Sequence, residues 1–233
     1  MITFEQLFGI QKEKIKKTCV LTPFLSDELV QSFDLKEFFR GSPFSCGQSE
    51  DISLIHTQIG APFVGDAVLY LSDTPCENLI FLGACSAVKP SDLHLGMIVI
   101  PGPVANCESF TSLLTRQINH TPLITGDQTL FGKIFELENS LTKVTCASFG
   151  SFKLEETYGE FLQQNNIQVV DMEVCAFYHA ARHIGRKGAA LLYVSEIMGE
   201  KHAFEPLTPP QQSLVQISRH KCARIIRQLA INL

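Results

Sequence analysis

The sequence predicts one layered α/β domain over residues 1–233. Short apolar runs of strand length alternate along the chain with amphipathic stretches of helix length, an order typical of helices packed against a sheet. A chain of 233 residues with 45% apolar content can bury a sizeable core. No internal repeat, low-complexity segment or change in composition marks a boundary between two domains.

The composition argues against several classes of partner. The net charge is -5, with 24 acidic against 19 basic residues, so we expect no nucleic-acid surface. No run approaches the roughly 20 apolar residues that span a bilayer, so we expect no membrane partner. Residues 1–17 contain no long apolar run that would form a secretory signal, so we expect a cytoplasmic protein; nothing in the sequence calls for a cofactor.

Eight cysteines are present, and we expect buried, reduced thiols rather than disulfides. A chain of this length has its own core and does not need covalent crosslinks. Most of the cysteines lie in apolar segments, as Cys19, Cys85, Cys146 and Cys175 do. No Cys-x-x-Cys pair is present, and we expect no metal site.

The start of the chain predicts a strand followed by a helix. After an amphipathic lead-in over residues 1–17, the apolar run 19–21 is typical of a buried strand. Ser26 is a suitable N-cap for a helix that would continue to about Phe39. The Gly, Ser and Pro of residues 41–43 would then end it.

The rest of the chain repeats this alternation. A strand at 52–57 runs into Gly60 and an apolar helix at 64–71, and a glycine at such a turn suits either a phosphate or sugar site or a plain tight turn. A looser region is expected after Pro103. Further strands are predicted at 79–87, 143–149, 167–170 and 189–194, and further helices at 127–141, 154–164 and 210–229.

The segment 167–181 predicts the most informative junction in the chain. A β-branched strand end at Val169 and Val170 is followed, after Glu173, by helical spacing of apolar residues. Asp171 and Glu173 therefore lie at the carboxyl end of a strand, where α/β sheets usually bind ligands. The alternative is a helix whose first turn carries acids to suit its dipole.

Asp171-Met172-Glu173-x-x-Ala176 resembles the Glu-Met-Glu-x-x-Ala signature of the nucleoside phosphorylase family, which includes purine and uridine phosphorylases and the methylthioadenosine/S-adenosylhomocysteine nucleosidases. The resemblance implies a single-domain three-layer α/β/α sandwich with a central mixed β-sheet, and a nucleoside-like small molecule as ligand. It also implies that Glu173 accepts hydrogen bonds from ribose hydroxyls and that Met172 packs under the sugar.

Two further segments are similar to family motifs. Residues 58–62 resemble a Gly-Ile-Gly-x-Pro loop that faces phosphate and ribose, which implies a binding role for Gly60, although Gln58 replaces the first Gly. The stretch that begins at Gly83 resembles a Gly-x-x-Gly strand followed by Leu-x-x-Gly-Asp, which implies a ligand-binding role for Gly83. Ser86 and Met97 replace the usual Gly and Asp of that stretch.

The resemblance also implies where the base would bind. Phe152 lies where family members place a segment against the base, so it or Phe149 would stack on a nucleobase; the alternative for both is core packing. Ser195-Glu196 stands where the family often has Ser-Asp, whose Asp protonates a purine leaving group. Glu196 would serve as general acid, hydrogen-bond the base without protonating it, or be structural.

The sequence favours hydrolysis over phosphorolysis. Phosphorylases of this family commonly carry arginines in the first strand–helix loop and before the central Gly, and residues 23–28 and 81–82 contain no base. Nucleosidases carry a Glu in the first loop, so Glu28, or Asp27, would activate water; the alternative is an ordinary helix cap and first turn.

Two other interpretations stay open. A phosphorylase would use a lysine or a neighbouring subunit's arginine to bind phosphate, and a diverged member would bind a nucleoside without cleaving it. The resemblance further implies a homo-oligomer, which would be a dimer, trimer or hexamer.

Overall fold

Two long apolar strands form the centre of the sheet in the computed structural model, which describes residues 2–109, 123–200 and 205–233. β5 (Asn78–Ala87) and β9 (Lys187–Ile197) pair in parallel along their whole lengths. Most residues of both strands are buried, because helices or other strands cover both of their faces. The continuous apolar run that predicted a central strand at 79–87 is therefore confirmed.

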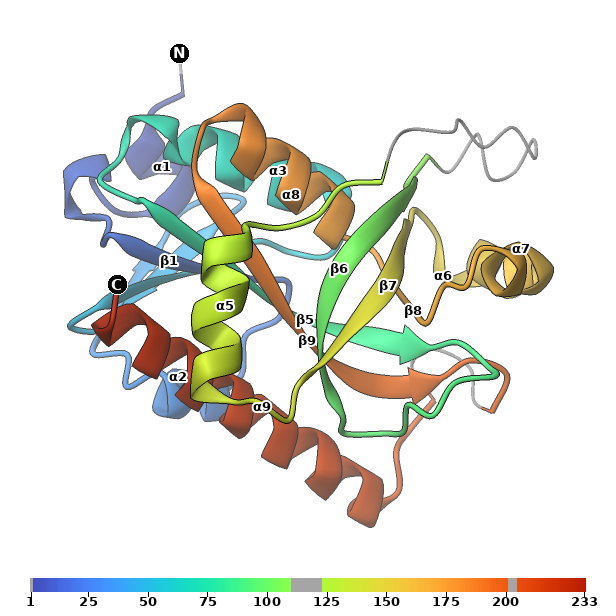
Figure 1. Ribbon diagram of the computed structural model, residues 1–233. Coiled ribbons are helices and arrows are strands. Elements are labelled where there is room, and N and C mark those ends of the chain that lie inside the picture. Colours follow the sequence, from blue (N-terminus) through green and yellow to red (C-terminus); the bar gives the residue numbers. More distant parts are fainter. Residues whose placement is uncertain (1, 110–122, 201–204) are drawn as a thin grey trace.

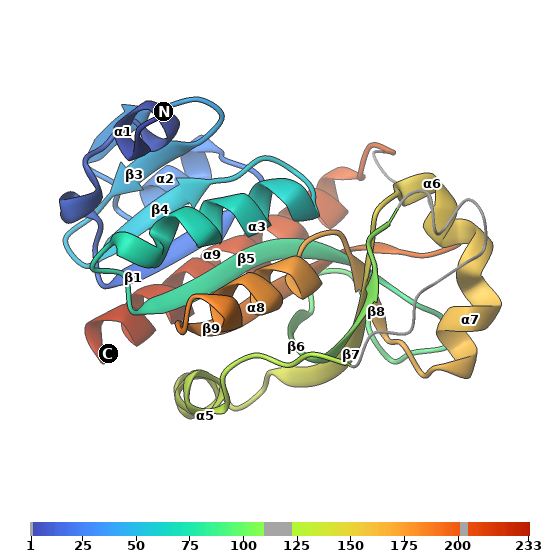
Figure 2. The ribbon, with the colours of Figure 1, turned by 90° about the horizontal axis from the view of Figure 1, so that it is seen from above.

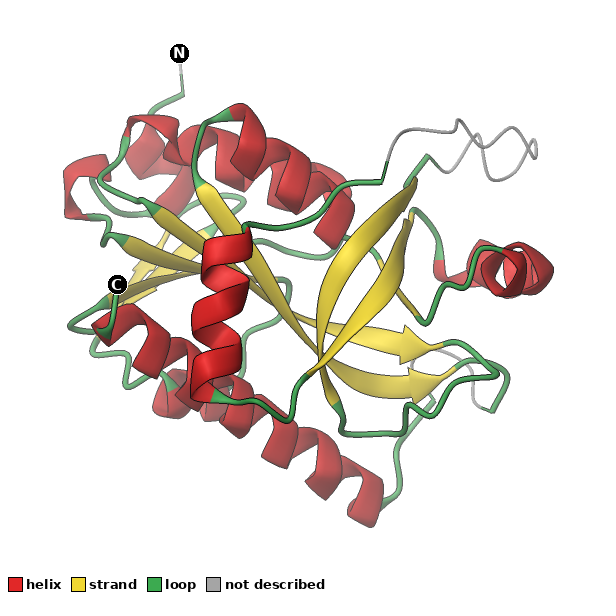
Figure 3. Ribbon diagram, viewed as in Figure 1, coloured by secondary structure: helices red, strands yellow, loops and turns green. Residues whose placement is uncertain are grey.

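The described residues form a nine-stranded mixed sheet in the order β2-β3-β4-β1-β5-β8-β7-β6-β9. Figure 3 shows its strands in yellow, with red helices around them. β1 pairs in parallel with β4 and β5, whereas β2, β3 and β4 are joined by antiparallel pairs. The remaining strands are β1 (Thr18–Thr22), β2 (Glu37–Arg40), β3 (Ser45–Gln48), β4 (Ile52–His56), β6 (Ile98–Cys107), β7 (Thr142–Phe149) and β8 (Val169–Asp171).

One half of the sheet closes on itself. β5 pairs with β9, β9 with β6, β6 with β7, β7 with β8, and β8 returns to β5. This ring of five strands is a small distorted barrel, and it has no free edge. β5, β8 and β9 end close together at one side of the ring, because Ser86 of β5 pairs with Val170 of β8 and with Glu196 of β9.

Helices cover both faces of the sheet, which gives the expected three layers (Figures 1 and 2). α1, α3 and α8 lie on one face, and α2 and α9 lie on the other; α5 packs against α9 and β9. α6 and α7 lie beside the barrel. The helices are α1 (Phe4–Phe8), α2 (Asp27–Ser32), α3 (Ala61–Tyr70), α5 (Gln128–Leu137), α6 (Phe152–Glu155), α7 (Gly159–Gln164), α8 (Val174–His183) and α9 (Pro209–Ile231), with 3-10 turns at Lys12–Lys14, Leu71–Asp73 and Glu156–Tyr158. The predicted α/β fold class is confirmed.

The predicted helix from Ser26 to about Phe39 is wrong beyond Ser32. Ser26 does cap the helix, since its hydroxyl accepts a hydrogen bond from the Leu29 N–H. The helix then ends, because Asp34 adopts a left-handed backbone conformation with φ 54°. The chain continues as β2, which pairs with β3 in a hairpin that the sequence analysis did not predict.

The looser region expected after Pro103 is also corrected for its first residues. β6 continues through the Pro-Gly-Pro segment and pairs with β7 as far as Cys107. The pairing register shifts between Pro101 and Val104, and such a bulge accommodates prolines that have no N–H to donate. Residues 110–122 of that region lie outside the described part of the chain.

The structure buries all eight cysteines as free thiols. Burial raises the pKa of Cys85 and Cys146 well above the ordinary value. Within the described residues, no helix combines the length and apolar character needed to cross a membrane. The expectation of one domain stays a prediction.

A substitution at Gly83 would test how tightly β5 is packed. A Cβ at this position would lie 2.5 Å from the Phe81 ring and 3.0 Å from a Leu192 methyl group, both in the buried sheet. We therefore expect Gly83→Ala to lower the free energy of unfolding by about 1–3 kcal/mol, measured by urea denaturation. Gly65→Ala is the matched control: it lies inside α3 with no atom within 4 Å of the new Cβ, and should be neutral or stabilising by about 0.5–1 kcal/mol. Equal effects at the two positions would contradict this account of the packing.

Candidate active site

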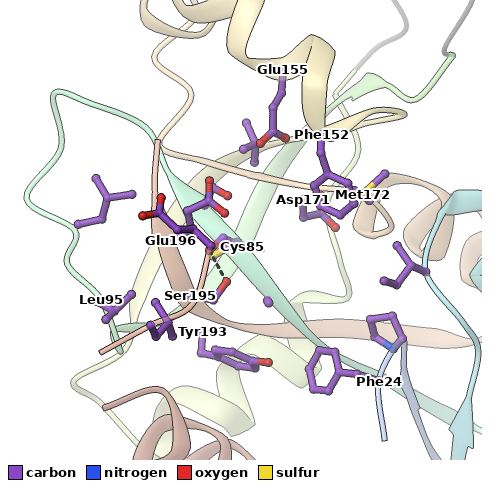
Figure 4. Close-up of a pocket in the computed structure, with 18 of the residues that line it drawn as sticks. Phe24, Cys85, Leu95, Phe152, Glu155, Asp171, Met172, Tyr193, Ser195 and Glu196 are labelled. Atoms are coloured by element: carbon purple, nitrogen blue, oxygen red, sulfur yellow. Dashed lines mark hydrogen bonds between the residues drawn. The ribbon is translucent and has the colours of Figure 1, made fainter. Parts of the chain in front are cut away.

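A cavity of about 520 Å³ lies at the carboxyl ends of β5, β8 and β9, where the barrel meets the rest of the sheet (Figure 4). Such a volume is in the range of small-molecule sites. Its lining combines apolar side chains with carboxyl groups, and includes Phe24, Phe152, Met172, Glu173, Ser195 and Glu196. Five of the eight sequence-predicted site residues are thus brought together here: Phe152, Met172, Glu173, Ser195 and Glu196.

Asp171 organises the junction between β8 and α8. One carboxylate oxygen accepts hydrogen bonds from the N–H groups of Glu173 and Val174, at 2.8 and 2.7 Å. The other oxygen accepts the Ser148 hydroxyl proton at 2.6 Å, and the Ser148 oxygen in turn accepts the Cys175 N–H at 2.9 Å. Burial raises the pKa of Asp171, and these hydrogen bonds oppose that shift by stabilising the anion. The acid at this junction therefore caps the helix.

Glu173 has a different role in the same turn. Its side chain lines the cavity, is 5% exposed, and accepts the Gly60 N–H at 2.7 Å. Burial, and then the charge of Asp171, raise the pKa of Glu173 to about 8, while the Gly60 N–H opposes the shift. The Gly60 N–H contacts one carboxyl oxygen, Oε1, and the Met172 N–H also stabilises the carboxylate.

The loop that holds Gly60 explains a departure seen in the sequence. Gln58 stands where the family motif has Gly, and it adopts φ 72°, in the left-handed region that favours glycine. The loop keeps the glycine conformation at a cost of about 1–2 kcal/mol. Gly60 itself has φ 111°, which other residues rarely adopt, and α3 begins directly after it. The backbone therefore presents the Gly60 N–H to Glu173 despite the substitution.

Phe152 and the end of β9 also contribute to the wall of the cavity. Phe152 is half-buried on α6 and lines the cavity, whereas Phe149 is fully buried against Tyr158 in the core. Ser195 lies at a bulge, because β5 shifts from pairing with Val194 to pairing with Glu196 between Cys85 and Ser86. The Ser195 hydroxyl donates to the Cys85 carbonyl at 3.4 Å (Figure 4), and the bulge places both Ser195 and Glu196 in the cavity wall.

Three predicted site residues do not line the cavity. Gly60 contacts Glu173 through its N–H, as described above. Gly83 is packed between Phe81 and Leu192 within the sheet. Glu28 lies on α2, where its carboxylate accepts a hydrogen bond from the Gln216 amide at 2.9 Å. The first loop instead contributes Pro23 and Phe24 to the cavity.

Sequence analysis missed four charged residues of the cavity lining: Glu155, Glu200, Glu205 and Arg219. Glu155, on α6, is 4% exposed, and burial followed by the charge of Glu196 raises its pKa to about 8. Arg219, on α9, lies over the rings of Phe24 and Tyr193 at 5.3 and 5.2 Å, and its Nε donates to the Tyr193 hydroxyl at 3.0 Å. The helical spacing from Phe152 to Glu155 was a usable signal, but the position of Arg219 depends on how α9 packs.

The lining is predominantly acidic. Among the described residues, it contains six carboxyl side chains and a single basic one, Arg219. The carboxyl groups belong to Glu155, Asp171, Glu173, Glu196, Glu200 and Glu205.

The described part of the chain comprises residues 2–109, 123–200 and 205–233. His179 and His183 on α8 have the i, i+4 spacing of a helical metal pair, which the sequence analysis overlooked, but both are exposed. No group of three or more His, Cys, Asp and Glu side chains within those ranges is arranged to hold a metal ion.

The capping role of Asp171 gives a stability prediction. Asp171→Ala would leave the Glu173 and Val174 N–H groups and the Ser148 hydroxyl without their shared acceptor inside the protein. We expect the free energy of unfolding to fall by about 2–4 kcal/mol in urea denaturation. Asp127→Ala, which removes an ordinary cap from α5, should cost about 1 kcal/mol. A smaller cost at Asp171 than at Asp127 would contradict the assignment.

The fold and the sequence were compared with known proteins. The chain is similar to a methylthioadenosine/S-adenosylhomocysteine nucleosidase from Campylobacter jejuni, with 16% identity and a TM-score of 0.75 over 94% of this chain and 100% of the other. It is similar to a uridine phosphorylase from Vibrio fischeri, with 16% identity and a TM-score of 0.77 over 99% and 100%. For futalosine hydrolase from Helicobacter pylori the values are 14% and 0.74 over 95% and 100%.

These identities are low, so the structural matches establish the fold alone. None of the curated proteins matches this sequence significantly. The family model described as "Phosphorylase superfamily" matches residues 22–230, which is most of the chain and includes every residue of the cavity lining. The resemblance identified from the sequence is confirmed, and the chain belongs to the phosphorylase superfamily.

Proposed function

We propose that this protein cleaves the N-glycosidic bond of a nucleoside, and that it does so by hydrolysis. The observation that carries the proposal is the position of Glu173: a buried carboxyl that lines a small-molecule cavity, with one oxygen held by the Gly60 N–H. A carboxyl fixed in this way suits the hydroxyl groups of a sugar. Members of the superfamily named above include nucleosidases, a nucleoside phosphorylase and a futalosine hydrolase.

The ribose would lie between Glu173 and Met172. In the absence of a ligand the Glu173 carboxyl is largely protonated at neutral pH, because its pKa is about 8. A protonated carboxyl can donate one hydrogen bond and accept others, which matches a ribose hydroxyl pair that also donates and accepts. Met172 is half-buried in the lining and gives the sugar an apolar surface.

The base would then lie toward Phe152 and Glu196. Phe152 offers an aromatic face from α6, and Glu196 offers a carboxyl from the end of β9. Stacking on an aromatic ring suits any nucleobase. A carboxyl beside the base can assist its departure by hydrogen bonding or by proton transfer.

The acidic lining supports hydrolysis. Cleavage of an N-glycosidic bond develops positive charge on the sugar, and carboxyl groups in a cavity shielded from water stabilise that charge. The carboxyl groups of the lining that are ionised at neutral pH repel a phosphate dianion, which a phosphorylase must bind. Since Glu28 lies outside the lining, the proposal assigns water activation to no residue of the first loop.

Phosphorolysis is the second candidate, and Arg219 is the observation that favours it. Arg219 supplies a cation in the cavity from α9, although the two loops expected to carry arginines have none. Its Nε is bound to the Tyr193 hydroxyl, so the two terminal nitrogens are the groups that would meet an anion. The homo-oligomer implied by the resemblance stays a prediction.

The test is base release from a nucleoside panel, with and without inorganic phosphate. The panel contains adenosine, inosine, uridine, methylthioadenosine and S-adenosylhomocysteine. We expect release that does not depend on phosphate, and a loss of about 100-fold or more in kcat/KM for Glu173→Gln, because an amide, unlike the carboxyl, cannot become an anion when positive charge develops on the sugar. Glu160→Gln removes an exposed carboxyl from α7 and should leave the rate unchanged.

Each alternative has its own result. Release that requires phosphate and is abolished in Arg219→Gln would replace hydrolysis by phosphorolysis. Loss of activity in Glu28→Gln would support the water-activating role suggested by the sequence. Nucleoside binding without release from any substrate would contradict an enzymatic function and indicate a binding protein.

A further inference from the structure

A second carboxyl group lies at the base end of the cavity. Phe152 and Glu155 are three residues apart on α6, so they lie on the same face of that turn and both line the cavity. The Ser151 side chain caps this turn by accepting the Leu154 N–H at 3.2 Å. Figure 4 shows Glu155 reaching into the cavity from α6, while Glu196 reaches into it from the end of β9.

Glu155 is buried without a partner that would stabilise its charge. Its side chain is 4% exposed, and no donor among the described residues forms a hydrogen bond or ion pair with its carboxyl group. An ionised carboxylate in such surroundings is costly. The group must therefore hold its own proton or meet a donor that comes with the ligand.

Within the described part of the chain, the charged groups that face Glu155 are all acids. They come from three elements: Glu196 from β9, Asp171 from β8 and Glu156 from the following turn, and each raises the pKa of Glu155 after the larger effect of burial. Glu200 and Glu205 line the same cavity. Lys153, on the same turn, is largely exposed and is ion-paired with Glu156 at 2.6 Å. Two neighbouring carboxyl groups that cannot both ionise retain a proton between them.

We propose that Glu155 and Glu196 act as one carboxyl pair that holds a single proton and delivers it to the leaving base. This inference rests on the proposed function. When the bond between C1′ of the ribose and the base nitrogen breaks, its electron pair goes to the base, and the proton of the pair moves to a nitrogen or oxygen of the base. Water then adds through its oxygen to C1′, and the proton that this water loses restores the pair.

The first test is the pH dependence of kcat/KM, because the reaction should require the proton that the pair holds. Wild type should keep its rate up to about pH 8 and lose it above, because the pair then loses its proton. In Glu155→Gln the repulsion that retains the proton is gone, so the fall in rate should move down by at least one pH unit, with the rate near pH 5 kept within a few-fold. Glu156→Gln, which changes the neighbouring exposed acid, should shift the fall by less than half a unit.

A leaving group that needs no proton gives the second test. p-Nitrophenyl riboside departs as a stable phenolate, so Glu155→Gln should cleave it at nearly the wild-type rate while cleavage of the nucleoside at pH 7.5 falls by 10-fold or more. A loss of the same size on both substrates would mean that Glu155 acts only on structure, and would overturn the proposal. An unchanged pH profile in Glu155→Gln would overturn it as well.

A third measurement does not need turnover. ¹³C NMR of carboxyl-labelled glutamate should contain, besides the resonance of Glu173, a second resonance that titrates near pH 8 and is absent in Glu155→Gln but present in Glu156→Gln. Absence of that resonance from wild type would overturn the pair. Its presence in a protein that cleaves no nucleoside would support the pair and overturn the proposed function alone.

Discussion

The hydrogen bonds of Asp171 hold together the junction on which the rest of the cavity depends. Its carboxylate binds the first N–H groups of α8 and the Ser148 hydroxyl of β7, so it fixes a strand, a neighbouring strand and a helix relative to one another. Met172 and Glu173 lie within this turn and have little freedom to move. The sequence predicted that Asp171 lies at a ligand site. In the structure its role is to position the next acid, Glu173.

The cavity concentrates carboxyl groups that would repel one another if all were ionised. The pKa of Glu173 and that of Glu155 are each raised to about 8, chiefly by burial. The free energy of unfolding is therefore highest below the ordinary glutamate pKa and falls as the pH rises from there to the raised pKa of the folded state, because the folded protein retains protons that the unfolded chain releases. A site that carries this cost is typical of function, because a neutral carboxyl can donate protons and an anionic one can stabilise a developing cation.

Much of the fold could be predicted from local pattern. The buried runs of β5 and β9 and the strand-to-helix turn at Asp171 follow directly from apolar periodicity. The hairpin of β2 and β3 could not be predicted in the same way, because it depends on the left-handed conformation of Asp34 and on pairing with β4. The course of β6 through two prolines depends on a bulge that local propensity does not reveal.

The residues of the site also fall into those that the sequence could predict and those that it could not. Residues close to a motif, such as Glu173 and Glu196, were found because the motif lies at a strand end. Arg219 and Phe24 meet only in the folded chain, where α9 packs across the first loop, and no spacing in the sequence predicts that contact. Glu28 is the opposite case. Its position in the sequence suggested a site residue, but in the structure its side chain binds Gln216 and does not line the cavity.

The most direct test of the central claim is a crystal structure with a C-nucleoside, whose carbon–carbon link to the base is not hydrolysed. The account predicts that the ribose hydroxyls lie within hydrogen-bond distance of the Glu173 carboxyl, with the base between Phe152 and Glu196. A nucleoside bound with its sugar away from Glu173, or bound outside the cavity, would contradict it.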